Sequence, residues 1–430
     1  MTTLPHSSMP SGLPLPVLQA LLLDLIAPAR TVQQSQVDAL SEADWQVLMR
    51  MVREHRLGPL LHWQLGQAHA DLQLPIEVAN RLANGYKKGT LRSLTLQREL
   101  VLVNRILQEA GIPSIALKGA YLAFHAYPQA ALRPLRDLDI LVPADQALKA
   151  YQVLQAGGLN RIDGYMGTPD AAMELSQHFP PLRSPSGNVN VELHHRAMHP
   201  SDDFPDLPDL SADPQFWQRA NRMLVGNAKI AFESPTDLLL HLIVHAVYDH
   251  EFNNGPLVLS DLAFLLRTHT IDWPLFWSLA ETGHHTRGCV LALQLTQIYW
   301  GQIPIVWSKD ALVLTEDPAL VAQIDQAALL MLRDMESRGD VARMAALSNV
   351  HTPLKRVSYL MGRVFVSKTE MAASYPVAQG DWRIYFVYPV RWWRLLTQRL
   401  PSTWRSNQQS HLLNEVDQLA GVKAWLRQSV

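Results

Sequence analysis

The segment from Arg136 to Val142, Arg-Asp-Leu-Asp-Ile-Leu-Val, constrains the fold of this chain more than any other segment. Its residues alternate between polar and apolar and then form an apolar run, which is typical of a half-buried strand. Because residues i and i+2 of a strand point to the same side, Asp137 and Asp139 project together from one face of a sheet. Two neighbouring carboxylates repel each other unless cations neutralise them, and Mg²⁺ prefers carboxylate oxygens. The segment therefore predicts a strand that carries a divalent metal site.

Short strand and helix patterns alternate on both sides of this segment. Over about 80 residues they indicate a small α/β unit. The predicted elements are a strand at 115–117, a helix at 118–127, a strand at 138–142, a helix at 145–156 and a strand at 188–194. We expect one further strand within 223–232, and we assign residues 111–233 to this core.

The chain on either side of this core has helical patterns. Apolar residues recur at helical spacing in 15–110, and Ser234-Pro235-Thr236-Asp237 is typical of a helix N-terminus. The sequence therefore predicts an α+β fold with three parts. These are an N-terminal helical region at 1–110, a small sheet domain at 111–233 and a C-terminal helical region at 234–430.

The bulk composition excludes several classes of protein. With 430 residues, 48% of them apolar, the chain is long enough for two domains and is not disordered overall. A net charge of −2 gives no global basic field for nucleic acid. The single cysteine, Cys289, excludes an internal disulfide framework and a cysteine-rich zinc site.

No targeting or membrane-spanning segment is expected. The hydrophobic stretch from Leu13 to Ala29 is interrupted by prolines and polar residues, and no basic region precedes it. No run reaches the roughly 18 apolar residues that a membrane-spanning helix needs. We expect a cytoplasmic protein, and the sequence leaves its oligomeric state open.

Other polar residues of the core could complete the site around the two aspartates. Glu192 lies between apolar residues of the third strand and would supply a third carboxylate. Lys118 and Gly119 follow the first strand and open a helix, where backbone N–H groups can bind phosphate. Arg133 and Arg136 could add positive charge to a triphosphate. Each feature alone is more often a solvated face or a turn, but their order and spacing favour a functional site.

At these residues the sequence resembles the uncharacterised bacterial nucleotidyltransferase family of the polymerase-β superfamily. Three blocks carry the resemblance: Leu117-Lys118-Gly119, Arg133 to Val142, and Val191 to His194. Leu239 to Ala246, followed by Leu259 to Leu262, is a weaker fourth block that resembles the helical segment of the family. The resemblance covers roughly residues 95–300, and the middle block is the specific one.

The resemblance implies a polymerase-β-like mixed sheet flanked by helical regions. It also implies that Asp137, Asp139 and Glu192 bind Mg²⁺, or Mn²⁺ in its place, and that an NTP is the substrate. The sequence departs from the superfamily pattern after the glycine, because this chain has Ala120 where the superfamily has a serine. The interval from Gly119 to Asp137 is also longer than in many members, so the phosphate-binding details differ.

Three histidines near the core have two interpretations each. His194 should share a strand face with Glu192, so it either orients a carboxylate or phosphate or is a partly exposed strand end. His241 and His245 lie one turn apart on a helix and either make interface hydrogen bonds or line an acceptor pocket. We expect Asp261 to pair with one of these histidines.

Three hypotheses for the function follow. The first is an enzyme that transfers an NMP group from an NTP to a hydroxyl or phosphate of an acceptor. The acceptor is a sugar, peptide, lipid intermediate, protein or RNA, and the sequence does not select among them. The second is a non-catalytic module that binds a nucleotide or a partner on the same fold. The third is a helical metal hydrolase centred on His241 and His245.

Overall fold

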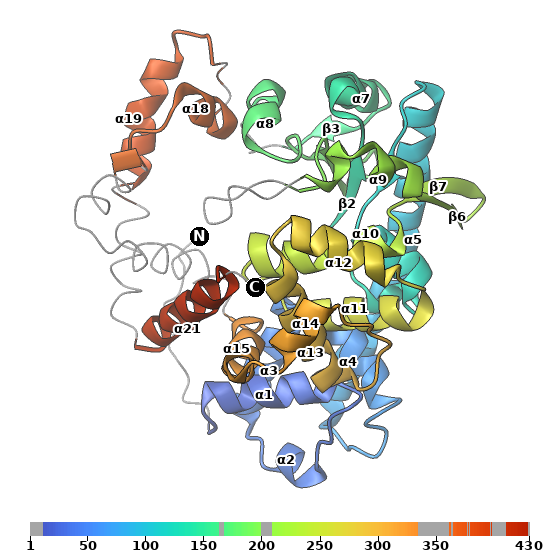
Figure 1. The fold of residues 1–430 in the computed structure, drawn as a ribbon, viewed down its shortest axis with the longest axis vertical. Helices are drawn as coiled ribbons and strands as arrows, with labels where there is room; N and C mark the ends of the chain where they lie inside the picture. Colours follow the sequence, from blue (N-terminus) through green and yellow to red (C-terminus); the bar gives the residue numbers. More distant parts are fainter. Residues whose placement is uncertain are drawn as a thin grey trace.

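The structure is a computed structural model, drawn as a ribbon in Figure 1. It describes residues 12–162, 167–198, 209–333, 361–362, 364–375, 377, 379–395, 397 and 410–428. These residues form a mixed α+β fold in which one seven-stranded sheet lies among many helices. The prediction of an α+β fold is therefore confirmed at this level.

The N-terminal part is helical, as predicted. Its helices are α1 (Leu15–Ile26), α2 (Gln34–Asp38), α3 (Glu42–Glu54), α4 (Gly58–Leu65) and α5 (Ile76–Glu109). Ser41 begins α3 with a capping box, because its side chain accepts from the backbone N–H of Asp44 and Asp44 returns the bond. The long helix α5 extends from this bundle to the sheet, where it contacts the strand β7 and the helix α7.

The sheet has strands in both directions. Its strands are β1 (Ile115–Ala116), β2 (Asp137–Leu141), β3 (Asn160–Arg161), β4 (Leu182–Arg183), β5 (Asn190–His194), β6 (Asn221–Val225) and β7 (Ala228–Phe232). Their order is β3-β4-β5-β2-β1-β7-β6. The pairs β2–β5 and β1–β7 are parallel, and the other pairs are antiparallel. The strand β2 therefore lies at the centre of the sheet.

The central pair of strands has matching burial on its two faces. In both β2 and β5 the first and third residues are half-buried and the second and fourth are buried. The buried residues Leu138, Ile140, Val191 and Leu193 belong to the main hydrophobic core. This is the alternation that the sequence predicts for a strand with one polar face.

The region 223–232 differs from the prediction of one strand, because it belongs to a hairpin. The strands β6 and β7 pair in antiparallel register from Asn221↔Phe232 to Val225↔Ala228. Gly226 at the turn has φ +59°, which glycine adopts without a steric penalty, as in two-residue hairpin turns. The residues on both sides of this turn are mostly apolar, so their pattern resembles that of one continuous strand.

Short helices connect the strands. The segment after β1 forms α6 (Gly119–Tyr121), which continues as a π-helical turn at Leu122–Ala126. The other helices of this part are α7 (Ala147–Ala156), α8 (Pro169–Leu175) and α9 (Pro214–Arg219). The helix α7 packs against β5 and α5.

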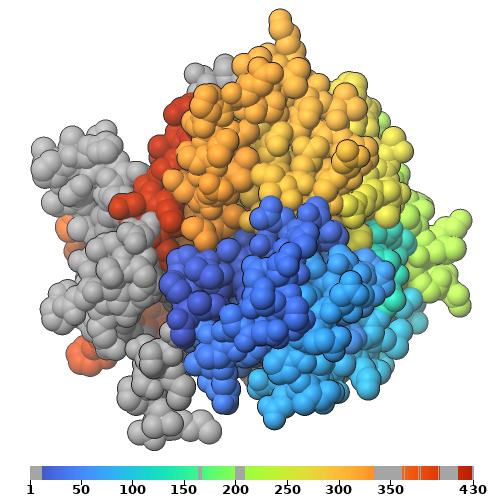
Figure 2. All heavy atoms as spheres, turned by 90° about the horizontal axis from the view of Figure 1, so that it is seen from below, coloured from blue at the N-terminus to red at the C-terminus, as the bar shows by residue number. Residues whose placement is uncertain are grey.

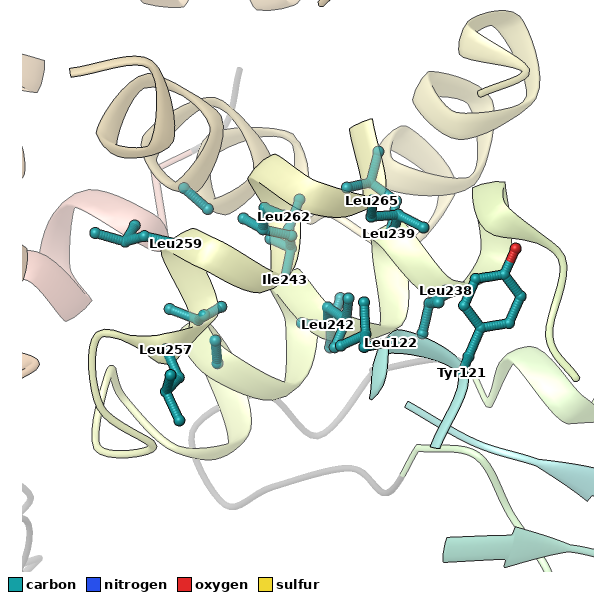
Figure 3. Packing of buried hydrophobic residues seen from close by; sticks show 14 of the residues in the cluster. Tyr121, Leu122, Leu238, Leu239, Leu242, Ile243, Leu257, Leu259, Leu262 and Leu265 are labelled. Carbon is teal, nitrogen blue, oxygen red and sulfur yellow. The ribbon is translucent and has the colours of Figure 1, made fainter. Parts of the chain in front are cut away.

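The C-terminal part is again helical. Its helices are α10 (Pro235–Val244), α11 (Leu257–Thr268), α12 (Trp273–Thr282), α13 (Thr286–Trp300), α14 (Lys309–Thr315), α15 (Pro318–Leu330), α18 (Lys368–Ser374), α19 (Ile384–Arg394) and α21 (Ser410–Leu426). Ser234 begins α10 as predicted, because its hydroxyl accepts from the backbone N–H of Asp237. In Figure 3, Leu238 of α10 lies beside Tyr121 and Leu242 lies beside Leu122. Helix α11 also contacts the π-helical turn at Leu122–Ala126, so both helices pack against the segment that follows β1.

One continuous hydrophobic core joins the N-terminal helices, the sheet and the C-terminal helices. On the face shown in Figure 2 the blue N-terminal helices lie directly against the orange C-terminal helices, and α1 contacts α15. Cys289 is buried in this core. Within the described residues, none of the helices has both the length and the apolar character that crossing a membrane requires.

Candidate active site

The five polar residues of the central strands β2 and β5 lie on one face of the sheet. In the parallel register of β2 and β5, Asp137 is opposite Asn190 and Asp139 is opposite Glu192. His194 follows Glu192 by two residues, so its side chain is on the same face. The structure thus brings Asp139, Glu192 and His194 together from two strands that are far apart in the sequence.

His194 contacts both carboxylates. Its Nε2 lies 3.1 Å from Oδ1 of Asp139 and 4.0 Å from Oε2 of Glu192. Burial lowers the pKa of His194 to about 4, although the hydrogen bond to Asp139 opposes this shift. The imidazole is therefore neutral at pH 7, and it donates Nε2–H to Asp139. Its Nδ1 is buried and has no hydrogen-bond partner among the described residues.

The three carboxyl groups differ in their affinity for protons. Burial, followed by the charges of Asp139 and Asp137, raises the pKa of Glu192 to about 8. Burial and the charge of Asp139 likewise raise the pKa of Asp137 to about 6. Burial would also raise the pKa of Asp139, but the hydrogen bond from His194 and the positive charge of Lys118 hold it below its ordinary value. Asp139 therefore stays ionised, whereas the protonated fractions of Asp137 and Glu192 would lose their protons to solvent when a cation binds.

The donor atoms fit a divalent metal ion. Among the described residues, the one group of three or more His, Cys, Asp and Glu ligand atoms lying within 4.8 Å of one another belongs to Asp139, Glu192 and His194. Two carboxylates suit Mg²⁺ or Mn²⁺, because both ions prefer oxygen ligands. Asp137 lies on the same strand face, two residues before Asp139, but is not part of this tight group.

A strained junction follows β1 beside these carboxylates. Lys118 has φ +44° and ψ −109°, a conformation that is sparsely populated for a residue with a side chain. Its backbone N–H donates to Oε2 of Glu233 at 2.8 Å, and Nδ1 of His241 lies 2.5 Å from the other oxygen of Glu233. The buried Glu233 therefore connects the Lys118-Gly119 turn to helix α10. Strain of about 1–3 kcal/mol at such a residue persists only where its surroundings hold it.

The side chain of Lys118 extends from this turn toward a histidine. Its Nζ lies 3.4 Å from Nδ1 of His245, which also contacts Oδ2 of Asp249 at 3.3 Å. Burial and the charge of Lys118 hold the pKa of His245 well below its ordinary value, so its imidazole is neutral. A Cβ atom at Gly119 would lie 2.6 Å from Cδ2 of Leu135, so a side chain at this position would require the end of the Leu135 side chain to move.

Arg133 belongs to the same wall but forms a buried ion pair. Its Nε donates to Oδ1 of Asp261 at 2.6 Å, and the hydroxyl of Tyr127 donates to the same oxygen at 2.7 Å. The expectation that Asp261 pairs with a histidine is therefore wrong. Helix α11, which carries Asp261, packs on the π-helical turn at Leu122–Ala126, and this packing brings Asp261 to Tyr127 and Arg133. Arg136 lies directly before β2, next to the carboxylates.

These groups line one cavity of about 540 Å³. Its walls carry all three carboxylates together with Lys118, Gly119, Arg133, Arg136, His194 and His245. Of the predicted site residues, only His241 does not line the cavity, because its ring is fully buried against Glu233. A cavity of this size accommodates a small ligand. Its mixture of anionic and cationic groups suits a metal–phosphate complex.

A comparison with protein families finds one match. The family described as "Uncharacterised nucleotidyltransferase" matches residues 41–301. The chain belongs to this family. The match includes β1, β2, β5 and helices α10 and α11, so every residue discussed above lies inside the family region. Comparisons with curated proteins and with solved structures give no match.

The family region also contains site residues that the sequence argument missed. Glu233 lies directly after β7, where a single glutamate between a strand and a capped helix gives no spacing signal. Nε2 of His178 lies 3.6 Å from Oε2 of Glu192, and the backbone of His178 forms an isolated antiparallel β-bridge with that of His194. The sequence around His178 has no strand pattern. Arg56, in the turn between α3 and α4, lines the cavity although the N-terminal region is helical throughout. All three reach the site only through tertiary packing.

His241 of α10 and His245 of the π-helical turn that follows it do not form a metal centre of their own. His241 contacts Glu233, whereas His245 contacts Lys118 and Asp249. Within the part of the chain that the structure describes, neither belongs to a group of three metal-ligating atoms. Their positions support the interpretation as interface hydrogen-bonding residues, with His245 at the cavity wall.

Proposed function

We propose that this protein is a metal-dependent nucleotidyltransferase with a polymerase-β-like active site. The observation that carries the proposal is the register of β2 and β5, which sets Asp139 opposite Glu192 inside a cavity whose lining, among the described residues, also contains Lys118 and three arginines. The family match supports the same class of reaction. The substrate would be an NTP, and the product would carry its NMP group.

The reaction joins an acceptor oxygen to the α-phosphorus of the NTP. The bond between the α-phosphorus and the bridging oxygen to the β-phosphate breaks, and pyrophosphate leaves with that bond's electrons. For a hydroxyl acceptor, the proton moves to Glu192 when its carboxylate is ionised. Mg²⁺ held by Asp137, Asp139 and Glu192 would supply Lewis-acid stabilisation of the phosphate oxygens.

Residues of the cavity wall would bind and orient the nucleotide. Lys118 would place its ammonium beside the triphosphate, and the backbone N–H groups that follow Gly119 would donate hydrogen bonds to phosphate oxygens. Arg136 would add a charge-assisted contact. Arg133 would act mainly through Asp261, because that ion pair already occupies its guanidinium. His194 would hold Asp139 in place by donating Nε2–H to it.

A non-catalytic nucleotide-binding module is the second candidate, and one feature favours it. Ala120 stands where the superfamily has a serine, so no hydroxyl follows Gly119 to contact a phosphate. The carboxylate group argues against this candidate. A protein that only binds a nucleotide has no need to keep three half-buried carboxyl groups that repel one another.

Transfer of label from an α-³²P-labelled NTP mixture tests the proposal. The protein is incubated with Mg²⁺ and a cell extract as the source of acceptor, and pyrophosphate release is followed in parallel. We expect Asp139→Asn to reduce both signals by about 10³-fold or more. The control is Asp145→Asn, which removes an exposed aspartate outside the cavity. Full activity of Asp139→Asn would reject the active-site assignment, and Mg²⁺–ATP binding without any transfer would favour the module.

A further inference from the structure

A second cavity lies next to the carboxylate cavity, on the side of the N-terminal helices. It has a volume of about 830 Å³ and is lined by residues of α3, α4, α5 and the loop before β2. Arg56 and Leu135 line both cavities. The two spaces therefore meet at these side chains, and the groups proposed to bind the NTP and metal occupy only one of them.

The second cavity is strongly basic. Among the described residues, its lining contains no aspartate or glutamate but six cationic side chains: Arg50, Arg53, Arg56, Arg81, Lys88 and Arg92. Among the described residues, none of the six forms an ion pair with a carboxylate. This concentration stands out in a chain with a net charge of −2. Six like charges around one hollow repel each other, so an anionic ligand would be bound strongly there.

Arg56 sits at the junction of the two cavities in a strained conformation. It follows the end of α3, where the backbone N–H of Leu57 closes the turn on the carbonyl of Val52 at 2.8 Å. A helix end of this kind requires a positive φ at the residue before the one that closes the turn, and that residue is usually glycine. Here it is Arg56, with φ +58°. Its Nε is buried and has no hydrogen-bond partner in the part of the chain that the structure describes. A positive φ and a buried, unpaired Nε both destabilise the fold, and an arginine that is kept in spite of them is typical of a binding site rather than of a helix end.

The wall formed by α5 leaves open space for a ligand. Gly85 and Gly89 lie inside this long helix, where each glycine costs about 1 kcal/mol relative to alanine. Gly89 has a structural reason, since a Cβ would lie 3.2 Å from the carbonyl oxygen of Ala131. Gly85 has none, because no atom lies within 4 Å of its Cβ position. The missing side chain at Gly85 enlarges the cavity.

We propose that this cavity binds the acceptor of the transfer reaction, and that the acceptor is a small molecule bearing phosphate groups. The identification as acceptor rests on the proposed function, whereas the anion site rests on the cavity alone. Five of the six cations are arginines, whose planar guanidinium groups bind phosphate oxygens in pairs. None of the described residues in the lining is aromatic, whereas sites for single-stranded RNA use aromatic side chains for base stacking. The volume suits a small molecule.

The test compares two triple variants that remove the same charge. The cavity variant is Arg53→Gln, Arg81→Gln and Lys88→Gln, and all three side chains are exposed, so the fold should tolerate the changes. The control variant is Lys87→Gln, Arg222→Gln and Lys229→Gln, at exposed positions away from both cavities. Calorimetry without divalent metal measures the binding of fructose 1,6-bisphosphate, with fructose as the uncharged comparison. Mg²⁺–ATP binding is measured on the same proteins.

We expect the cavity variant to bind the bisphosphate at least about tenfold more weakly, while the control variant binds it as the unchanged protein does. Both variants should bind Mg²⁺–ATP with unchanged affinity. Equal losses in the two variants, or no loss in the cavity variant, would overturn the proposal. The assignment to a small molecule would be overturned if the unchanged protein bound a single-stranded RNA more tightly than the bisphosphate and the cavity variant no longer bound that RNA. Bisphosphate binding that depends on the cavity, together with absence of labelled transfer, would reject the proposed function alone.

Discussion

Asp139 and Glu192 are direct neighbours across the parallel strands β2 and β5, and His194 contacts both of them. The pair lies in a partly buried cavity, where the two negative charges would repel each other strongly. A neutral His194 relieves Asp139 through a hydrogen bond, but Glu192 keeps its proton until a cation arrives. Four predictions follow from this difference between the two carboxyl groups and from the residues that position them.

Binding of a divalent metal ion should release protons at neutral pH. Without the ion Glu192 has a pKa of about 8 and Asp137 a pKa of about 6, so Glu192 is largely protonated at pH 7. The ion requires ionised carboxylates, and its affinity should therefore rise between pH 6 and pH 8. Calorimetry of Mg²⁺ or Mn²⁺ binding in two buffers with different ionisation enthalpies counts the protons. An affinity that is independent of pH over this range would contradict the prediction.

The change Glu192→Gln should stabilise the metal-free protein at alkaline pH. In the unfolded chain the glutamate ionises near its ordinary pKa of 4.5, whereas in the folded protein it ionises near 8. The folded state thus binds more protons between these values, and the free energy of unfolding of the natural protein falls as pH rises through this window. Glutamine removes this loss, so we expect a gain on the order of 1–3 kcal/mol at pH 8 and little at pH 4.5.

Denaturant unfolding at both pH values measures this effect, with Glu281→Gln as a control at an exposed position on α12. In excess Mg²⁺ the order should reverse, because the ion binds and stabilises only the protein that retains Glu192. A Glu192→Gln protein that is equally stable, relative to the natural protein, at pH 4.5 and pH 8 would show that the carboxyl group is not held protonated.

His194 should act as a positioning residue for Asp139. In His194→Ala the hydrogen bond to Asp139 is lost, so the pKa of Asp139 should rise toward its ordinary value or beyond it. The acidic limb of the pH profile of nucleotide transfer should then move to higher pH. His194→Gln offers an N–H donor again and should restore part of the profile. A uniform loss of activity with an unchanged pH profile would indicate a purely structural role.

Glu233 should stabilise both the fold and the phosphate-binding turn. Its two buried oxygens accept from the backbone of Lys118 and pair with His241. Glu233→Ala leaves both partners without an acceptor, and we expect a loss of about 3 kcal/mol or more in the free energy of unfolding. Glu233→Gln keeps one acceptor oxygen and should lose less. If the turn matters for the nucleotide, the affinity for ATP should fall in the alanine variant under conditions where it remains folded. Equal stability of both variants would contradict this role.

The strand segments were predictable because their signals are local. Alternation in 137–142 and 188–194 predicts both central strands and places Asp137, Asp139, Glu192 and His194 on their polar faces. The caps at Ser41 and Ser234 likewise predict where α3 and α10 begin. The hairpin β6–β7 was predicted as one strand, because a two-residue turn at Gly226 interrupts an otherwise apolar pattern.

The sequence by itself determined which face of each strand carries the carboxylates, because the backbone geometry of a strand fixes the alternation of its side chains. Only the tertiary structure decided that Asp139 lies opposite Glu192, because the register between distant strands depends on how their buried faces pack. Tertiary packing also brought Glu233, His178 and Arg56 to the site and paired Asp261 with Arg133. These contacts join residues far apart in the chain, and no local pattern in the sequence encodes them.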